Sequence, residues 1–379
     1  MKRKLALLGA TGSIGTNTLD VINAYSDYFD VVLLSAHRDI DKLAEIAKSF
    51  PSALLAVTDE KLINKDTRIH YWGPSGLLEA IRDCSADMVV NGIAGAAGLL
   101  PSITALESGA DLALANKETI VMAGPLVFSI AKKNHRRIIP VDSEHSAVFQ
   151  LLEAHGSDAM EEIILTASGG PFHQYSREQL QRVTLRDALA HPTWNMGGKI
   201  TIDSASLANK GLEVIEAVRL FSLRPEQVTV LVHPQSIVHS LVRLKDGSLY
   251  AQLSKPDMRL PIHNALFWPE VKPNQFGRLS LENQNLSFEK PKTDLFPLLS
   301  LAYKVAKLGT GYPVTFNAAN EEAVAAFISG RISFMDISRI VETVLQFDWS
   351  CDDRELQSIL GVDTKARNVV QGIIKEFSH

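Results

Sequence analysis

Short apolar runs alternate with segments of helical periodicity through residues 1–141 of the chain. Residues 41–48 carry apolar positions at helical spacing, which predicts an amphipathic helix. Buried strands are predicted at residues 5–8, 31–34, 87–90 and 137–141. Alternation of strands and helices is typical of a parallel sheet with helices on both faces. We therefore predict that residues 1–141 form an α/β domain with a Rossmann-like, doubly wound sheet.

The pattern changes beyond this first domain, where Ser, Gly, His and Asn become frequent. Apolar segments at 228–232 and 249–253 predict strands of a second sheet, so we expect an α+β catalytic domain over residues 142–267. Residues 268–293 contain several Pro, Asn and Gln residues without periodicity, which is typical of an extended linker. Helical periodicity returns in residues 294–379 and predicts a small C-terminal helical bundle.

The composition and the net charge exclude several classes of protein. Of the 379 residues, 46% are hydrophobic and 21% are charged, which suits two or three globular domains and excludes a disordered chain. The net charge of −5 lacks the basic excess that binds phosphates, so no nucleic-acid partner is expected. Cys84 and Cys351 are the only cysteines, which excludes a disulfide scaffold and a four-cysteine zinc site. No apolar run approaches the roughly 18 residues that cross a bilayer, so we expect a cytoplasmic protein without a membrane partner.

A glycine-rich turn, Gly9–Gly15, follows the first predicted strand and precedes a helical pattern. Its spacing is GxxGxxG, and such turns let the backbone approach a pyrophosphate at the start of the next helix. A purely structural turn is the alternative, but the position between strand and helix favours a dinucleotide. His37 and Arg38 follow the second strand, where a basic group accommodates the 2′-phosphate of NADPH. NADPH is therefore the expected cofactor, with a solvated basic turn as the alternative.

Two further segments of the first domain are candidates for ligand contacts. A second glycine run, Gly92–Gly98, follows a predicted strand and either lines the cofactor or provides a close helix–strand contact. Asn116, Lys117 and Glu118 follow an apolar stretch, at the carboxyl end of a strand where such folds bind ligands. A surface Lys–Glu pair is the alternative at these positions.

Acidic residues beyond the first domain suggest a metal site. Asp142 and Glu144 are two residues apart, and in an extended segment their side chains point to the same side. Carboxylates without thiolates suit a hard ion, Mg²⁺ or Mn²⁺, and a solvated strand end is the alternative. Asn209, Lys210 and Glu213 lie within about one helical turn. This set suits a metal with a phosphorylated substrate, and an ordinary capped helix is the alternative.

The segment 191–198 places large side chains between Pro192 and a Gly-Gly pair. Such a segment suits a lid that covers the substrate and excludes water. A rigid surface loop with a buried Trp194 is the alternative.

These motifs occur together in one order along the whole chain. They are Gly9–Gly15, Leu114–Glu118, Pro140–Ser146, Thr166–Phe172, His191–Gly198, Ile202–Glu213, His233–Ser236, Pro256–Arg259 and Phe316–Glu321. In this combination the chain resembles the 1-deoxy-D-xylulose 5-phosphate reductoisomerase family. The resemblance implies an NADP-dependent oxidoreductase that rearranges and reduces 1-deoxy-D-xylulose 5-phosphate to 2-C-methyl-D-erythritol 4-phosphate with a divalent metal ion. It also implies a homodimer that serves the methylerythritol phosphate route to isoprenoid precursors.

The resemblance further implies roles for individual residues. The metal ligands would be Asp142, Glu144 and Glu213, and the catalytic residues would be Glu144, Lys210 and His191. The substrate, a small sugar phosphate, would contact Lys117, Ser143, Glu144, Ser168, His191, Ser204, Asn209, Lys210 and Glu213. NADPH would contact Thr11, Gly12, Ser13, Ile14, Asn116, Glu118 and Gly197, in addition to His37 and Arg38 from the charge argument.

Two turns depart from the family pattern. His37-Arg38-Asp39 stands where relatives often have a Gly-basic-Asn turn, so the Asp39 carboxylate falls near the expected 2′-phosphate. Ser254-Lys255 stands where a glycine-containing turn is common.

Two other functions are alternatives to the reductoisomerase. One is a metal-dependent sugar-phosphate isomerase or aldolase without hydride transfer, which the glycine turn with His37 and Arg38 argues against. The other is a non-catalytic NADPH-binding regulatory module, in which the carboxylates would be dispensable.

Overall fold

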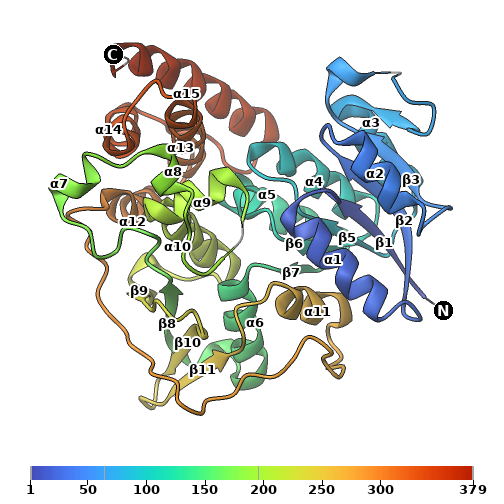
Figure 1. Ribbon diagram of the computed structural model, residues 1–379, viewed down its shortest axis with the longest axis horizontal. Helices are drawn as coiled ribbons and strands as arrows, with labels where there is room; N and C mark the ends of the chain where they lie inside the picture. Colours follow the sequence, from blue (N-terminus) through green and yellow to red (C-terminus); the bar gives the residue numbers. More distant parts are fainter. Residues whose placement is uncertain (1, 64, 195, 378–379) are drawn as a thin grey trace. The chain divides into compact units, whose positions relative to one another are not determined.

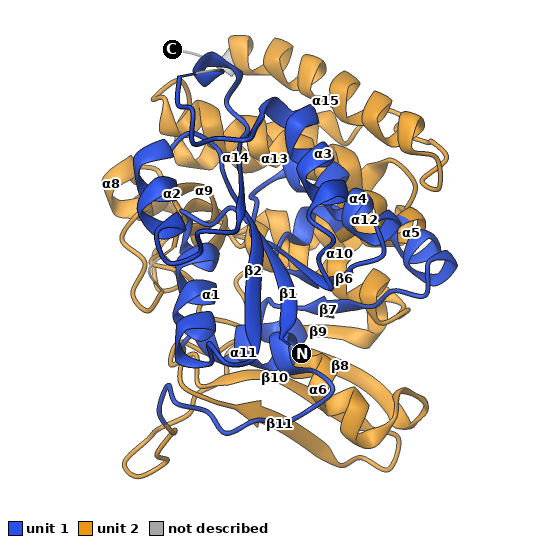
Figure 2. Cartoon of the chain, turned by 90° about the vertical axis from the view of Figure 1, so that its right-hand side faces the viewer, with its two compact units in different colours: residues 1–119, 127–146, 257–277 blue, residues 120–126, 147–256, 278–379 orange. Residues whose placement is uncertain are grey.

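The computed structural model describes residues 2–63, 65–194 and 196–377, and its chain divides into two compact units (Figure 2). Unit 1 comprises residues 1–119, 127–146 and 257–277, and unit 2 comprises residues 120–126, 147–256 and 278–379. Each unit therefore combines segments that are distant in the sequence.

Unit 1 is built on a seven-stranded sheet with the order β4-β3-β2-β1-β5-β6-β7, in which all paired strands are parallel. The strands are β1 (Arg3–Leu8), β2 (Phe29–Ala36), β3 (Leu54–Val57), β4 (Tyr71–Trp72), β5 (Met88–Asn91), β6 (Asp111–Leu114) and β7 (Ile138–Pro140). The strand order reverses between β1 and β5, which is the switch point where open α/β sheets bind ligands. The prediction of a Rossmann-like sheet is confirmed, as are its four predicted strands.

Helices connect these strands, as the periodicity predicts (Figure 1). They are α1 (Ser13–Ala24), α2 (Ile40–Ala47), α3 (Gly73–Asp83), α4 (Leu99–Glu107) and α5 (Lys117–Lys133), with α6 (Ser143–His155) after β7 and the short 3₁₀ turns η1 (Glu60–Leu62) and η2 (Ala96–Gly98). The chain returns to unit 1 at α11 (Arg259–Phe267), which packs against α1. The Arg3 guanidinium donates to the Leu266 carbonyl at 2.5 Å, and this bond ties α11 to the first strand.

Unit 2 contains a four-stranded mixed sheet with the order β11-β10-β8-β9. Its strands are β8 (Met160–Ala167), β9 (Val228–Val232), β10 (Val238–Leu244) and β11 (Leu249–Leu253). β10 is antiparallel to both of its neighbours, whereas β8 and β9 are parallel. The second sheet predicted from the segments at 228–232 and 249–253 is confirmed.

The helices of unit 2 share one hydrophobic core with this sheet. They are α7 (Arg177–Leu180), α8 (Leu185–Ala188), α9 (Gly198–Ala205), α10 (Ala208–Leu220), α12 (Pro297–Leu308), α13 (Tyr312–Ile328), α14 (Phe334–Val344) and α15 (Leu356–Phe377), with η3 (Ser157–Ala159) and η4 (Pro225–Gln227). Leu165 of β8, Ile202 of α9 and Phe316 of α13 all belong to the core cluster. The predicted helical C-terminal region is thus confirmed, and its helices are packed into the same core as α9 and α10.

Residues 268–293, all of which the structure describes, contain no helix or strand apart from one isolated bridge (Figure 1). In that bridge the backbone N–H groups of Val232 and Glu289 each donate to the other's carbonyl, at 2.8 and 2.9 Å. Among the described helices, none is long and apolar enough to cross a membrane.

Candidate active site

The loop between β1 and α1 has the geometry of a phosphate-binding turn. Gly9 has φ = +78°, and a Cβ on Gly15 would lie 2.3 Å from the Gly9 carbonyl oxygen, so both positions require glycine. No described side chain caps the first turn of α1 at Gly12. The backbone N–H groups of this turn are therefore suited to an anionic ligand, and the helix dipole adds to the attraction.

The second glycine run, Gly92–Gly98, makes close contacts in unit 1. A Cβ on Gly92 would lie 3.1 Å from the Ile14 Cβ, and one on Gly98 would lie 2.5 Å from the Asn116 Cγ. Of the two alternatives for this run, the structure therefore supports close packing at these two positions.

Asn116 stands at the start of α5 and fixes the loop after β5. Its Oδ1 accepts the Thr119 N–H at 2.9 Å, and its Nδ2 donates to the carbonyls of Ile93 and Gly95 at 2.7 and 2.9 Å. Nδ2 also lies 3.0 Å from the Glu118 carboxylate. Lys117 and Glu118 are both buried, so the alternative of a surface Lys–Glu pair is wrong.

The basic turn after β2 is exposed, and its acidic residue is engaged in capping. The Arg38 side chain is 70% exposed and lies 3.1 Å from the His37 Nε2. Asp39 is the N-cap of α2, because its Oδ1 accepts the Lys42 N–H at 3.0 Å. The positive end of the helix dipole partly offsets the charge of Asp39.

Lys42 is a residue of this region that the sequence analysis missed. Its ammonium donates to the Thr11 carbonyl at 2.8 Å and so links α2 to the glycine loop. The sequence could have indicated this contact, because Lys42 lies in the first turn of the helix that follows the basic segment.

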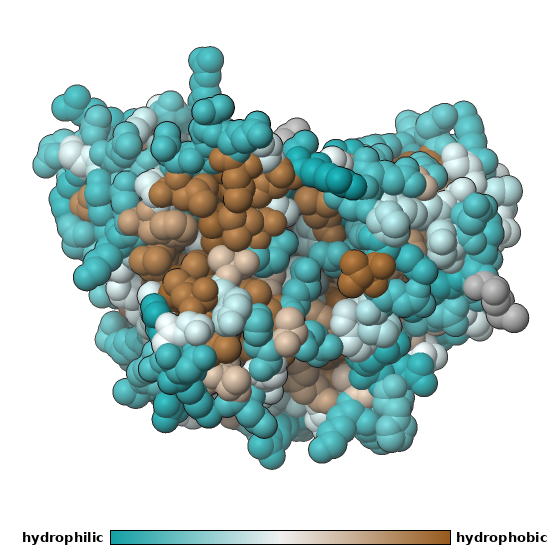
Figure 3. All heavy atoms as spheres, turned by 90° about the horizontal axis from the view of Figure 1, so that it is seen from below, coloured by the Kyte–Doolittle hydropathy of each residue, from teal (hydrophilic) through white to brown (hydrophobic). Residues whose placement is uncertain are grey.

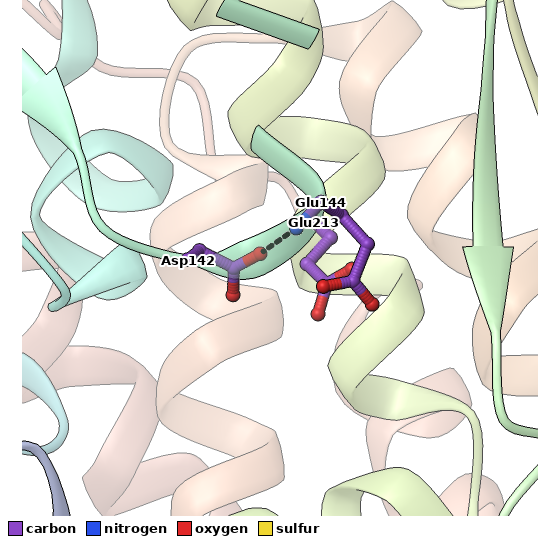
Figure 4. A group of neighbouring side chains, drawn as sticks. All are labelled: Asp142, Glu144 and Glu213. Atoms are coloured by element: carbon purple, nitrogen blue, oxygen red, sulfur yellow. Dashed lines mark hydrogen bonds between the residues drawn. The ribbon is translucent and has the colours of Figure 1, made fainter. Parts of the chain in front are cut away.

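The three predicted metal ligands come together (Figure 4). Asp142, Glu144 and Glu213 each offer one carboxylate oxygen, and these oxygens lie within 4.8 Å of one another. Such separations suit oxygen ligands of one divalent cation. The premise of an extended segment was wrong, because α6 begins at Ser143 and places Glu144 in its first turn. The Glu144 N–H instead donates to the Asp142 Oδ1 at 3.2 Å.

Lys117 and His145 of unit 1 keep Asp142 ionised. The Lys117 ammonium lies 2.9 Å from its Oδ2, and the His145 Nδ1 lies 3.2 Å from its Oδ1. Burial opposes ionisation, but Lys117 and the hydrogen bond from His145 outweigh it and hold the pKa of Asp142 well below its usual range. The Asp142 carboxylate is therefore anionic at neutral pH.

The first turns of α10 hold Glu213 in place. Leu207 precedes the helix in the left-handed conformation, with φ = +58°. The Asn209 amide donates to one Glu213 oxygen, and the Lys210 ammonium pairs with the other. Lys210 and Glu213 are 2% and 1% exposed. An ion pair this deeply buried needs such hydrogen bonds to remain favourable, so the geometry of Glu213 is tightly specified.

A second polar group of unit 2 surrounds His191. The His191 Nε2 lies 3.0 Å from the Ser168 hydroxyl and 3.2 Å from the Ser204 hydroxyl. Its Nδ1 accepts the N–H groups of Thr193 and Trp194 at 3.1 and 2.9 Å. The proton of the neutral ring therefore sits on Nε2 and faces the two serines. Burial lowers the pKa of His191, which favours this neutral form.

The predicted lid, 191–198, is described except for Asn195, which lies outside the described residues. Gly197 is the N-cap of α9, and Trp194 is half-buried with its ring 6.4 Å from that of His239. His239, which the sequence analysis did not single out, also lies 2.9 Å from the Ser254 hydroxyl at the second turn that departs from the family pattern. The Ser254 side chain is therefore held by a hydrogen bond to His239 of β10.

A parallel sheet with a glycine loop at its switch point, and three carboxylates gathered for one cation, define a dinucleotide-binding α/β enzyme with a divalent-metal site. Models of 1-deoxy-D-xylulose 5-phosphate reductoisomerase match residues 5–124, and models of its C-terminal domains match residues 138–221 and 253–369. The chain belongs to the 1-deoxy-D-xylulose 5-phosphate reductoisomerase family.

Individual relatives are similar to this chain over its full length. The reductoisomerase of Treponema denticola is 47% identical over 373 residues, covering 97% of this chain and 96% of that protein. The reductoisomerase of Pelodictyon phaeoclathratiforme is 48% identical over 380 residues, covering 98% of this chain and 100% of that protein.

Solved structures of reductoisomerases share the fold. The enzyme of Zymomonas mobilis in complex with NADPH is 38% identical, with a TM-score of 0.89 and 99% of each chain covered. A reductoisomerase in complex with NADPH, fosmidomycin and magnesium is 39% identical, with a TM-score of 0.92 and 98% of each chain covered.

Proposed function

We propose that the residues described above carry out the reaction of this family. The protein is an NADPH- and divalent-metal-dependent oxidoreductase that rearranges and reduces 1-deoxy-D-xylulose 5-phosphate to 2-C-methyl-D-erythritol 4-phosphate. The observation that carries our residue assignment is the cluster of Asp142, Glu144 and Glu213, with ligand oxygens within 4.8 Å of one another. Solved relatives bound to NADPH and magnesium support both cofactors.

The donor set fits a hard divalent ion. Asp142, Glu144 and Glu213 offer only carboxylate oxygens, which suit Mg²⁺ and equally Mn²⁺. When bound there, such an ion polarises the substrate's ketone and acidifies its hydroxyl group. We propose that either ion supports the reaction.

Side chains around this cluster handle charge and protons at the reacting end of the substrate. Lys210 contributes a buried ammonium that stabilises negative charge developing on a substrate oxygen. Glu144, at the start of α6, is the proposed proton relay, and the Ser143 hydroxyl donates to its Oε2. Lys117 holds Asp142 in its ionised form and faces the same reacting end.

The phosphate end of the substrate is assigned to the polar group of unit 2. Ser168 and Ser204 are already joined by hydrogen bonds to the His191 imidazole, and Asn209 lies in the first turn of α10. A neutral imidazole with its proton on Nε2 donates a hydrogen bond to the dianion. The binding energy of this remote group then orients the reacting carbons. Residues 191–198 are the proposed lid that excludes water.

NADPH is assigned to the glycine loop and the helix starts around it. Its pyrophosphate would lie against the first turn of α1, and its 2′-phosphate against the exposed basic turn after β2. The proposed contacts are Thr11, Gly12, Ser13, Ile14, His37, Arg38, Asn116, Glu118 and Gly197. NADPH supplies the hydride for the second step.

We further propose that the protein is a homodimer formed through the sheet of unit 2. Ile164, Val238 and Leu241 form a small apolar cluster apart from the main core, with Leu231 and Leu253 partly buried against it. Leu249 of the edge strand β11 points to the same face as Leu253 and is 46% exposed. Figure 3 shows a broad hydrophobic area on the side where this sheet lies. A second copy covering this face would remove the apolar surface from water.

The remaining assignments are also proposals. Residues 1–141 bind the cofactor, 142–267 bind the metal and substrate, 268–293 are a linker, and 294–379 form the helical domain. Isoprenoid precursor biosynthesis is the proposed pathway, and the cytoplasm the proposed compartment, with no nucleic-acid or membrane partner.

One assay tests the proposed function. Purified protein is mixed with 1-deoxy-D-xylulose 5-phosphate, NADPH and Mg²⁺, and the absorbance of NADPH is followed with and without EDTA. We expect oxidation of NADPH that EDTA abolishes and excess Mg²⁺ or Mn²⁺ restores. Consumption of the sugar phosphate without NADPH oxidation would instead support an isomerase or aldolase. Cofactor binding with no consumption of substrate would support the regulatory module.

A further inference from the structure

The sequence motif Phe316–Glu321 on α13 has no role in the site described so far. It contains two asparagines, Asn317 and Asn320, that are completely buried. Burying an amide among apolar side chains costs free energy unless the amide is hydrogen-bonded, so each asparagine needs a structural reason for its place.

Asn320 reaches across to α9. Its Nδ2 donates to the Asp203 Oδ1 at 2.8 Å, and the two residues are 117 positions apart in the sequence. Asp203 is 1% exposed, and its other oxygen pairs with the Lys199 ammonium at 2.8 Å. Both oxygens of this buried carboxylate therefore have a partner, one from α13 and one from the first turn of α9.

The next residue along α9 is Ser204, whose hydroxyl lies 3.2 Å from the His191 Nε2. Successive residues of an α-helix are about 100° apart around its axis, so the two side chains leave α9 in different directions. A rotation of α9 that broke the bond between Asp203 and Asn320 would also move the Ser204 hydroxyl. The amide of Asn320 thus fixes the direction in which Ser204 points.

Apolar packing alone does not give this precision. Ile202 and Ala205 of α9 are fully buried in the core of unit 2, and they hold the helix against its neighbours. Hydrophobic contacts are non-directional, so they tolerate small rotations and shifts along the axis. A hydrogen bond to a charged acceptor requires a donor distance near 2.8 Å and a nearly linear approach, so it selects one orientation.

We propose that Asn320 is a positioning residue for substrate phosphate, acting through Asp203 and Lys199 to orient Ser204 on α9. The inference rests on the proposed assignment of Ser204, His191 and Ser168 to the phosphate. Asn320 does not touch the substrate. It determines how well the phosphate site is formed before the substrate binds. Of the proposed NADPH contacts, Gly197, the N-cap of α9, is the one next to this helix, and the others lie in unit 1.

Asn320→Ala is the direct test. We expect the KM for 1-deoxy-D-xylulose 5-phosphate to rise about 10-fold, because a buried bond to a charged group is lost. The KM for NADPH should stay within about 2-fold of the value for the unmodified protein, because distant sites usually respond almost independently to a substitution. Asp203→Asn keeps an oxygen acceptor for Asn320 but removes the charge that Lys199 pairs with, so it should raise the KM for the sugar phosphate less than Asn320→Ala does.

A matched control separates positioning from general stability. Asn317→Ala removes an equally buried amide from the same helix, where it donates to Glu321 at 3.1 Å. It should lower Tm about as much as Asn320→Ala and leave the KM for the sugar phosphate unchanged. Equal KM changes in both variants, or a lower Tm with no KM change in Asn320→Ala, would overturn the proposal.

Lys199 provides a second test in case Asn320→Ala fails to fold. Its side chain is 24% exposed, so the protein should fold with a substitution there. Lys199→Met should raise the same KM about 3-fold and Lys199→Arg should restore it, because only the ammonium–carboxylate pair differs. No effect of Lys199→Met would also count against the proposal. The unmodified protein is assayed in parallel, so a failure of the proposed function appears there as absent turnover, independently of the variants.

Discussion

The proposed cofactor site of unit 1 and the proposed substrate site of unit 2 consist of different chemical groups. In unit 1 the glycine loop after β1 offers backbone N–H groups, and its geometry depends on glycines six residues apart, Gly9 and Gly15. In unit 2 the site is made of side chains that follow β8 or lie on α9 and α10, such as Ser168, Ser204 and Lys210. Ser168 and Ser204 come from separate segments and are joined by hydrogen bonds through His191. A site made from backbone is defined by local sequence, whereas a site made from side chains depends on long-range packing.

Different kinds of substitution should impair the two kinds of site. A backbone loop is sensitive to steric change, because an added methyl group meets backbone atoms that cannot move aside. A buried polar site is sensitive to loss of charge or of a hydrogen bond, because each partner left unpaired is costly. Four variants test this contrast.

The largest effect is expected for Glu213→Gln. The neutral amide is a poor ligand for a divalent ion and leaves the buried ammonium of Lys210 without its counter-charge. We expect kcat to fall at least about 100-fold while NADPH binding persists, measured by NADPH oxidation and by cofactor titration. Glu153→Gln, at an exposed position on α6, is the control. Full activity of Glu213→Gln would contradict the metal assignment.

Gly15→Ala is expected to damage unit 1 selectively. The new Cβ would lie 2.3 Å from the Gly9 oxygen and 2.5 Å from the Ala10 oxygen, so the loop must shift at a cost of about 1–3 kcal/mol. The KM for NADPH should rise about 10-fold or more. Gly361→Ala, where no heavy atom lies within 4 Å, should leave the KM unchanged and raise Tm slightly, because alanine is favoured over glycine inside a helix. An unchanged cofactor KM in Gly15→Ala would show that the loop does not bind NADPH.

His191 provides a pH test of unit 2. Burial lowers its pKa in the folded protein, so the unfolded chain takes up the proton first. The stability from neutral His191 is therefore complete above its unfolded pKa of about 6.5 and is lost as pH falls through the lower folded value. Protonation of Nδ1 also breaks its bonds from Thr193 and Trp194. We expect the KM for the sugar phosphate to rise in this acidic range.

His191→Gln checks the origin of that pH dependence. It should raise the KM for the sugar phosphate about 10-fold at neutral pH, since the bond from Nε2 is lost. It should also flatten the acidic rise, because glutamine does not titrate. Asp142 cannot account for this rise, since its pKa lies well below the usual range of carboxyl groups. An unchanged acidic rise in the variant would assign the titration to another group.

The smallest effect is expected for Arg38→Ala. Its guanidinium is 70% exposed and 3.9 Å from Asp59, so solvent screens its contribution. The KM for NADPH should rise about 3-fold, and the KM for NADH should rise less, as measured with both cofactors. Arg68→Ala, another exposed arginine of unit 1, is the control. Equal changes for NADPH and NADH would mean that Arg38 does not interact with the 2′-phosphate.

Much of unit 1 could be predicted from the sequence, because its signals are local. The strand at 5–8, the turn Gly9–Gly15 and the helix after it are contiguous, and each element is recognisable by its own periodicity. The expected conformation at Asp142 and Glu144 was nevertheless wrong. Two carboxylates two residues apart can share a side in a strand, and here they do so because a helix starts between them.

The amino-acid sequence by itself determined the strand–helix alternation, the residue types available for each ligand and the family to which the chain belongs. Only the tertiary structure decided which buried groups from separate segments are partners: Lys117 with Asp142, and Asn320 with Asp203. Local periodicity reflects the burial of each segment on its own. The pairing of buried charges and amides depends on where packing brings segments together, and residues 117 positions apart carry no local sign of their contact.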